Sequence, residues 1–316
     1  MPDRLKFNKL HSSRVLIVGG RSLLYSFTPR SVQKLGTSGI GYAIAEGALE
    51  SGASAVILAS SNPSRVETAI SRLQKSYPDL SSRASITGQA CDLSDVSTLE
   101  SNIESLLGFA TENGAKPLDH ILNTAGSIKG MASLADTTPE NLAQLLTVRF
   151  SAPAMIAKHA VAGQYLSPGP SSSITFTSGS TVEKHMPGRA CGSGIASSLV
   201  GLTRGLAIDL APLRVNLILP GAVNTELWDH LPAEQKQGLV DSFGKSMLTG
   251  RVPGPKVIAE SYLYAMKDAN LTGVCLSTHG GQLLAWPSAR EYGQGYASYH
   301  QPHRQQSAYS ALRVMW

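Results

Sequence analysis

Long apolar runs and closely spaced cysteines are both missing from this sequence of 316 residues. No apolar run approaches the roughly 20 residues that a membrane-spanning helix needs, and the N-terminal stretch has no apolar centre of the kind found in secretory signals. The three cysteines, Cys91, Cys191 and Cys275, have neither metal-site nor redox-motif spacing. We therefore expect free thiols, no bound metal, no membrane contact and a cytoplasmic location.

Charge is also scarce, because charged residues make up only 16% of the chain. The net charge of +5 comes from two segments, residues 21–36 with +3 and residues 287–316 with +2, so the remainder sums to zero. Binding to a phosphate backbone needs a basic face on a folded domain. The sequence therefore predicts no nucleic-acid partner.

Hydrophobic residues make up 42% of the chain, enough for a substantial core. Short apolar runs alternate with longer segments in which apolar residues recur every three to four positions. The expected strands are 15–18, 55–59, 85–89, 120–123, 174–177 and 215–219, and the expected helices are 39–51, 64–76, 96–112, 139–162 and 191–210. This alternation predicts an α/β fold, a single Rossmann-type doubly wound parallel sheet with helices on both faces.

Two segments interrupt this alternation. Residues 21–36 separate an apolar run from the glycine-rich stretch that follows it, and residues 286–316 are rich in Tyr, Gln, Ser and His without sustained periodicity. We expect an N-terminal extension over 1–13, one nucleotide-binding domain over 14–285 that contains the insertion, and a poorly ordered tail over 286–316.

Removal of residues 21–36 joins the two halves of a glycine-rich turn into VLIVGGTSGIG. Gly19, Gly39 and Gly41 then have G-x-x-x-G-x-G spacing between a strand and a helix. Such a turn brings backbone N–H groups and a helix N-terminus to a pyrophosphate. The predicted phosphate-binding residues are Gly19, Gly20, Thr37, Ser38, Gly39, Ile40 and Gly41. Residues 21–36 are then either a surface excursion or, as we favour, a translated intron.

Five further motifs follow at suitable distances: CDL at 91–93, NTAG at 123–126, TSGS at 177–180, the stretch GLTRGLAIDLAPLRVNLILPGAVNTE at 201–226, and STHGGQLL at 277–284. Together with the glycine turn they resemble the short-chain dehydrogenase/reductase family over residues 14 to about 285. The resemblance implies a small-molecule substrate and a homodimer or homotetramer. It also implies that Asp92 lies beside the adenine, that Asn123, Ala125 and Gly126 form a wall of the cofactor cleft, and that Pro220, Gly221, Val223 and Thr225 flank the nicotinamide.

The end of the second expected strand bears on the choice of cofactor. A carboxylate there would bind the ribose 2′-hydroxyl of NAD and repel a 2′-phosphate, but this chain has Ser60, Ser61 and Arg65 instead. Hydroxyl groups and a guanidinium suit a phosphate. We therefore expect NADP(H) in preference to NAD(H), although Arg65 could equally be a solvated helix residue.

The family's catalytic residues are replaced in this chain. Its Tyr-x-x-x-Lys pair falls on Gly192 and Ala196, and no tyrosine lies between residues 165 and 262. The family's Ser falls on Gly179, which Ser178 and Ser180 flank, and its Asn falls on Arg149. The candidate catalytic residues are therefore Arg149, Ser178 and Ser180.

Loss of the pair leaves three chemical possibilities. The substrate is already cationic, such as an iminium, and needs only hydride. Alternatively, another acid supplies the proton, with Glu183, Lys184, His185 and Arg149 as candidates. Alternatively, the domain binds ligands without redox turnover.

The motifs at 177–180 and 201–226, together with the loss of the Tyr and the Lys, are similar to the pattern in fungal short-chain reductases of natural-product pathways. Among these are reductase/Diels–Alderases of indole alkaloid assembly. In those proteins an Arg matches Arg149, whereas an Asp stands at the place of Met186. We therefore expect an NADP-dependent oxidoreductase that reduces an imine, an iminium or a carbonyl of a small secondary-metabolite intermediate. The alternatives are a non-redox cyclase, a nucleotide-binding pseudoenzyme, or a chain that its insertion inactivates.

Overall fold

The computed structural model describes residues 9–19, 39–126, 133–185, 187–229 and 231–285. The predicted insertion 21–36, the predicted tail 286–316 and four residues singled out above, Gly20, Thr37, Ser38 and Met186, lie outside the described residues. By its contacts the chain divides into two units, residues 1–283 and 284–316. Only Leu284 and Ala285 of the second unit are described, so the predicted domain boundaries remain predictions.

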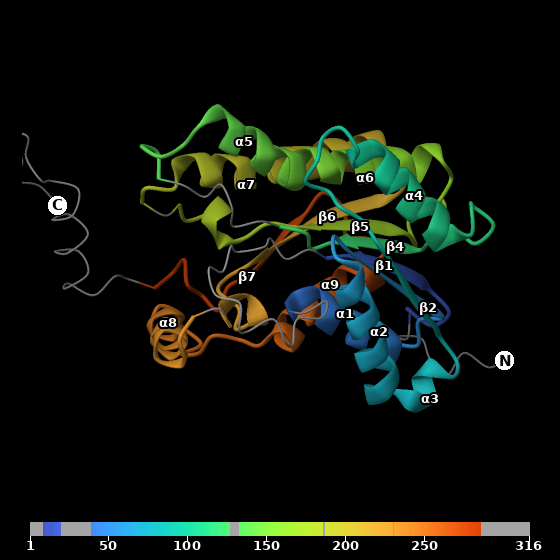
Figure 1. Cartoon of the computed structure of the whole chain (residues 1–316), viewed down its shortest axis with the longest axis horizontal. Coiled ribbons are helices and arrows are strands. Elements are labelled where there is room, and N and C mark those ends of the chain that lie inside the picture. Colours follow the sequence, from blue (N-terminus) through green and yellow to red (C-terminus); the bar gives the residue numbers. More distant parts are fainter. Residues whose placement is uncertain (1–8, 20–38, 127–132, 186, 230, 286–316) are drawn as a thin grey trace, which may run out of the picture. The chain divides into compact units, whose positions relative to one another are not determined.

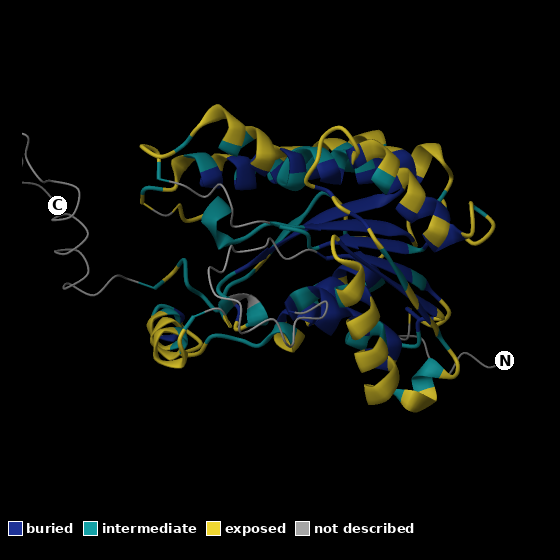
Figure 2. Ribbon diagram, viewed as in Figure 1, coloured by how far each residue is buried: buried dark blue, intermediate teal, exposed yellow. Residues whose placement is uncertain are grey.

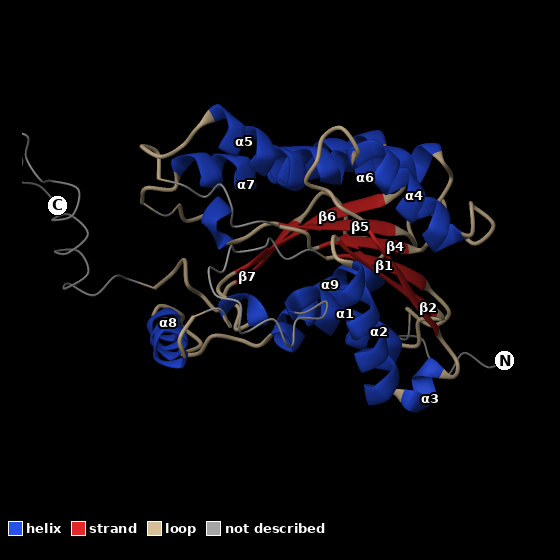
Figure 3. Ribbon diagram, viewed as in Figure 1, coloured by secondary structure: helices blue, strands red, loops and turns tan. Residues whose placement is uncertain are grey.

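Seven parallel strands form one sheet in the order β3-β2-β1-β4-β5-β6-β7 (Figure 3). Their bounds are β1 Arg14–Val18, β2 Ala55–Ser60, β3 Ser85–Ala90, β4 His120–Asn123, β5 Ser173–Thr177, β6 Arg214–Pro220 and β7 Cys275–Thr278. The six expected strands match β1 to β6 within one residue at each end. β7 was not expected, because CLST is short and half polar. The predicted doubly wound parallel sheet is confirmed.

Helices cover both faces of the sheet, with α4, α5, α6 and α7 on one face and α1, α2 and α9 on the other (Figure 1). Their bounds are α1 Gly39–Glu50, α2 Pro63–Ser76, α3 Pro78–Ser81, α4 Leu99–Thr111, α5 Pro139–Leu146, α6 Ala152–Ala162, α7 Ala190–Asp209, α8 Ala233–Lys245 and α9 Pro255–Lys267. The sequence analysis predicted neither α8 nor α9.

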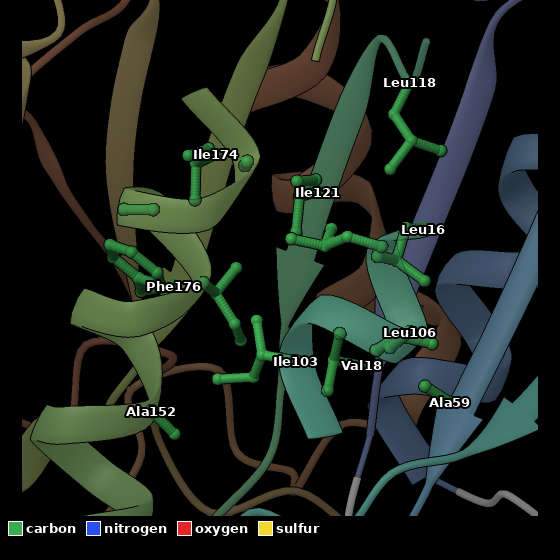
Figure 4. Packing of buried hydrophobic residues seen from close by; sticks show 14 of the residues in the cluster. Leu16, Val18, Ala59, Ile103, Leu106, Leu118, Ile121, Ala152, Ile174 and Phe176 are labelled. Atoms are coloured by element: carbon green, nitrogen blue, oxygen red, sulfur yellow. The ribbon is translucent and has the colours of Figure 1, made fainter. Parts of the chain in front are cut away.

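Each face of the sheet has its own apolar core, because successive side chains of a strand point to opposite faces. Leu16 and Val18 of β1 pack into one core, where Figure 4 shows them among Ile103 and Leu106 of α4. Val15 and Ile17 belong to the other core, with α1, α2 and α9. The inner strands β1, β2, β4, β5 and β6 are consequently buried on both sides, as the dark blue centre of the sheet in Figure 2 shows, whereas the edge strands β3 and β7 are partly exposed.

The expected continuous helix over 139–162 is wrong in detail. A π-helical turn, Thr147–Ser151, separates α5 from α6. Pro153 has no N–H with which to donate to the carbonyl of Arg149, so regular i→i−4 bonding cannot continue there. π turns of this kind often occur at functional sites, and this one carries Arg149.

The interior of the sheet contains an arginine that binds main-chain carbonyls. Arg214, at the start of β6, is only 2% exposed. Its guanidinium donates to the carbonyls of Ala265 at 2.6 Å and Met266 at 2.8 Å, and its Nε donates to that of Pro170 at 2.6 Å. Carbonyls in the last turn of a helix lack intrahelical partners, so Arg214 fixes the end of α9 and the loop before β5 to β6.

A buried histidine, His120 on β4, lies level with Arg214 in the register of the sheet. His120 pairs with Ser173 across β4 and β5, and Ser173 pairs with Arg214 across β5 and β6. The His120 ring is 3% exposed, and its Nδ1 lies 2.9 Å from the Ser173 hydroxyl. Burial, together with the nearby Arg214 cation, lowers the pKa of His120 from 6.5 to about 3.

This pKa predicts a pH-dependent stability. The unfolded chain takes up the proton at a higher pH than the folded chain, so His120 favours folding fully above about pH 6.5. That contribution is lost as the pH falls from about 6.5 toward 3, at up to about 1.4 kcal/mol per pH unit. In urea unfolding at pH 4.5 to 7, His120→Asn should therefore lose less stability on acidification than the wild type. His11→Asn, at an exposed site, is the control, and equal slopes for wild type and His120→Asn would contradict the prediction.

Candidate nucleotide and substrate site

All the strands end at the same edge of the sheet, because they run parallel. Loops that follow different strands consequently meet there. Backbone hydrogen bonds continue the strand pairing for one residue past the strand ends. The donors and acceptors are Gly19 N and Ala59 O at 2.9 Å, Thr124 N and Val18 O at 2.8 Å, Ser178 N and Ile218 O at 3.0 Å, and Gly221 N and Thr278 O at 3.1 Å. The described site residues that directly follow these strands, such as Gly19, Ser178 and Gly221, therefore lie along this edge.

The beginning of α1 is shaped by two glycines. Gly39, the first residue of α1, has φ +68°, a conformation that side chains disfavour. At Gly41 a Cβ would lie 3.1 Å from the Thr124 hydroxyl and 3.6 Å from Ile17 Cγ2. The missing side chain therefore lets the helix pack directly on β1 and on the loop after β4. This is the close approach that a pyrophosphate turn requires.

A carboxylate already lies at this helix N-terminus. Glu226 Oε2 accepts a hydrogen bond from Gly39 N at 2.8 Å, and α1 has no acidic residue in its own first turn. A helix N-terminus favours negative charge. With respect to charge, the Glu226 carboxylate stands in for a phosphate, so the donors present here fit the pyrophosphate of a dinucleotide. The sequence analysis missed Glu226, although it directly follows the predicted Thr225.

The segment after β6 packs beside α1. Pro220 ends β6, Val223 is buried in the core that α1 shares, and Thr225 Cγ2 lies 3.3 Å from where a Gly39 Cβ would stand. A Cβ on Gly221 would lie 2.9 Å from the Cα of His279, which follows β7. The four residues predicted to flank the nicotinamide therefore belong to one chain segment, which lies between the start of α1 and the end of β7.

At the ends of β2 and β3 the predicted adenosine residues differ in accessibility. Ser60 is 2% exposed, whereas Ser61 is exposed and Arg65, in the first turn of α2, is half-buried. Asp92 accepts hydrogen bonds from the amide of Ser94 at 3.0 Å and from its hydroxyl at 2.8 Å. Of the three residues predicted to meet a 2′-phosphate, Ser61 and Arg65 are therefore the accessible ones.

The loop after β4 lies against Arg149. Asn123 is buried, and its Oδ1 accepts from the amide of Ala125 at 3.0 Å. A Cβ on Gly126 would lie 3.4 Å from Nη2 of Arg149. The π-helical turn thus directs the guanidinium toward the predicted cleft wall, and burial lowers the pKa of Arg149.

The start of α7 passes beside the end of β5. The Ser178 hydroxyl donates to the carbonyl of Ala196 at 2.9 Å. Gly192 and Ala196 are both buried and lie four residues apart, hence on one side of α7. Neither side chain can transfer a proton. Ser180, half-buried, begins the short 3-10 turn Ser180–Val182 that follows.

Polar side chains from the turn after β5 meet polar groups from β7 and from the residues that follow β7. Glu183 accepts a hydrogen bond from the Ser277 hydroxyl at 2.7 Å, and His279 Nε2 lies 3.9 Å from the same carboxylate oxygen. Lys184 Nζ donates to the carbonyl of Gln282 at 3.5 Å, and His185 Nδ1 lies 2.7 Å from the carbonyl of Thr181. The candidate acids are thus held by neighbours, and Ser277 and His279 were not predicted.

Within the described residues no group of three or more His, Cys, Asp or Glu side chains could hold a metal ion. Cys91, Cys191 and Cys275 are free thiols, and burial raises the pKa of Cys91 to about 12. No helix in the described ranges has the length and apolar character needed to cross a bilayer.

Comparison with known proteins agrees with this geometry. The family model of the SDR-like Rossmann domain matches residues 7–285. The short-chain dehydrogenase/reductase malC of Malbranchea aurantiaca is 38% identical over 283 residues, 90% of this chain and 99% of that protein. The short-chain dehydrogenase/reductase fsr5 of Gibberella fujikuroi is 34% identical over 88% of this chain and 97% of its own. The structure of the MalC reductase/Diels–Alderase superposes with a TM-score of 0.77, covering 88% of this chain and 98% of that one.

Two glycines allow a test of the packing at this edge. Gly221→Ala should destabilise the protein by roughly 1–3 kcal/mol, because the new Cβ would collide with the backbone of His279. Gly201→Ala is the matched control, because this exposed site within α7 has nothing within 4 Å of the new Cβ. There, higher helix propensity should stabilise by about 0.5–1 kcal/mol. Thermal and urea unfolding would measure both, and a neutral Gly221→Ala would contradict the close approach.

Proposed function

Because the chain belongs to the short-chain dehydrogenase/reductase family of oxidoreductases, we propose that it is an NADP(H)-dependent reductase. Its proposed substrate is an imine or iminium, or a carbonyl, in a small intermediate of secondary metabolism. The nicotinamide, when bound, supplies the hydride. The likeness to MalC, described as a reductase/Diels–Alderase, supports a reductase activity.

The observation that carries the proposal is that Gly192 and Ala196 occupy one side of α7, beside Ser178, where we predict the family's proton donor. Hydride addition to a neutral ketone builds negative charge on oxygen, and proton donation there is typically worth 10²–10⁴-fold in rate. Gly192 and Ala196 cannot provide it, and the Ser178 hydroxyl is directed to the Ala196 carbonyl. Hydride addition to an iminium gives a neutral amine and needs no such donor.

Arg149 and Glu183 supply charge at the same edge of the sheet. Arg149 lies against Gly126, where its N–H groups can donate to a substrate carbonyl or amide oxygen. The Glu183 carboxylate, held by Ser277, places negative charge on the turn that follows Ser178 and Ser180. In this proposal Arg149 orients the substrate, and Glu183 favours a cationic one electrostatically.

The cofactor choice rests on the end of β2. Ser61 and Arg65 offer a hydroxyl and a guanidinium to a 2′-phosphate, and neither Ser60 nor Ser61 would repel it as an acid would. Phosphate binding by these residues favours NADP(H) over NAD(H). We also propose that the chain assembles as a homodimer or homotetramer and acts away from membranes and nucleic acids.

A second candidate is a non-redox cyclase that retains the nucleotide cleft. The relative MalC is described as a Diels–Alderase as well as a reductase, which favours this candidate. The predicted lack of a proton donor on α7 favours it too. Such a protein would bind nucleotide without consuming it. Oxidation of NADPH in the presence of an imine separates the two candidates.

We predict the following for the chain from which residues 21–36 are removed. NADPH should bind at least about tenfold more tightly than NADH, because Ser61 and Arg65 can bind the 2′-phosphate. A cyclic imine should be reduced, and the matched ketone should react at least about 10²-fold more slowly. Fluorescence titration of both cofactors and stopped-flow NADPH oxidation measure these quantities.

Arg149→Ala in the same chain should lower turnover more than it lowers cofactor affinity, since in this proposal its guanidinium orients the substrate. Arg83→Ala, at an exposed site, is the control. Brisk ketone reduction would contradict the proposed chemistry. Binding of NADPH without any oxidation by an imine would favour the cyclase.

A further inference from the structure

The hydrogen bond between Glu226 and α1 joins residues that are 187 positions apart in the sequence. Glu226 lies directly after the loop that leaves β6, at the start of the short 3-10 turn Glu226–Trp228. Its Oε2 receives the first N–H of α1 at 2.8 Å. The contact therefore depends on the fold and is not a local helix cap.

A pyrophosphate at this helix N-terminus would compete with the Glu226 carboxylate for the Gly39 N–H. In a Rossmann-type fold the pyrophosphate lies at the N-terminus of the helix that follows the first strand, which in this chain is α1. The Gly39 N–H points to one acceptor, the Glu226 carboxylate. A carboxylate and a pyrophosphate at hydrogen-bond distance from the same donors would also repel each other strongly.

The turn that carries Glu226 is linked to α8 by two contacts. The Trp228 ring stacks on that of Phe243 in α8, with centroids 5.9 Å apart and planes 19° from parallel. The Lys236 ammonium lies 2.7 Å from the Asp229 carboxylate. Figure 2 shows α8 exposed along most of its length, and Gly244 is its only buried residue. Because little apolar surface holds α8 in place, it can follow the turn at small energetic cost.

We propose that Glu226 is an internal competitor of the cofactor's pyrophosphate. In the nucleotide-free protein its carboxylate satisfies the N-terminus of α1. Nucleotide binding displaces it, and the turn with Trp228 and α8 moves with it. Glu226 therefore sets the affinity for the dinucleotide and couples cofactor binding to α8. This inference rests on the proposed function for the presence of a nucleotide.

The experiment compares wild type, Glu226→Gln and Glu234→Gln, each as the full chain and without residues 21–36. Titrations use NADPH and also ADP, which has a diphosphate but no nicotinamide. Glu226→Gln removes the competing charge, so its Kd for both ligands should fall about fivefold, within the range of helix-terminus electrostatics. Without ligand, the same variant should show a lower Tm, because α1 loses its anion. Glu234→Gln removes an exposed carboxylate in the first turn of α8 and should change neither quantity.

Trp228 provides a readout that does not depend on turnover. With Trp286→Phe and Trp316→Phe, Trp228 is the one remaining tryptophan of the chain's three. Its fluorescence should change when NADPH binds, and Glu226→Gln should show part of that change without ligand.

The outcomes separate this inference from the proposed function. If wild type binds NADPH and Glu226→Gln binds it equally or more weakly, the competition is refuted while the proposed function stands. If neither protein binds NADPH or ADP, with or without residues 21–36, both are refuted. Tighter binding by Glu226→Gln together with the Trp228 signal supports the competition, even if no imine is reduced.

Discussion

The parallel pairing of all seven strands is the constraint on which the rest of this structure depends. It brings the carboxyl ends of β1, β4, β5, β6 and β7 to one edge, so residues from Gly19 to His279 lie along the same edge although they are far apart in the sequence. Glycines at 41 and 221 allow the helix and the loops to approach this edge closely. Arg214 holds the opposite ends of β5 and β6 to the last turn of α9 through main-chain carbonyls.

On this scaffold the proposed site has charged side chains, but Gly192 and Ala196 stand where we predict the family's proton donor. Arg149 is directed at Gly126 by a π-helical turn, and Glu183 is held by Ser277. Between them, α7 presents Gly192 and Ala196, with Ser178 bonded to the helix backbone. Such an arrangement suits a substrate that accepts hydride without needing a proton in the same step. The Glu226 carboxylate accepts a hydrogen bond from Gly39 N at the start of α1. In the proposed competition, the nucleotide displaces this carboxylate.

Apolar runs and helical periodicity were enough to predict the sheet, six of its strands and most of its helices, because buried parallel strands read as continuous apolar segments. β7 and α8 were not predicted, since CLST is half polar and α8 has one buried residue. The π-helical turn depends on a single proline, Pro153, within an otherwise regular pattern. The burial of Ser60 and the contacts of Glu226 and His279 arise only from tertiary structure, so no local signal could show them. The predicted roles of the site residues remain predictions.

The most direct test of the central claim is the pH dependence of single-turnover NADPH oxidation with a permanently charged N-alkyl cyclic iminium. If α7 supplies no proton because none is needed, the hydride-transfer rate should be the same within about twofold from pH 6 to 9. A rate that falls roughly tenfold per pH unit as a single acid loses its proton would contradict the account, because hydride addition to this iminium consumes no proton and the step would then depend on an ionising group of the protein.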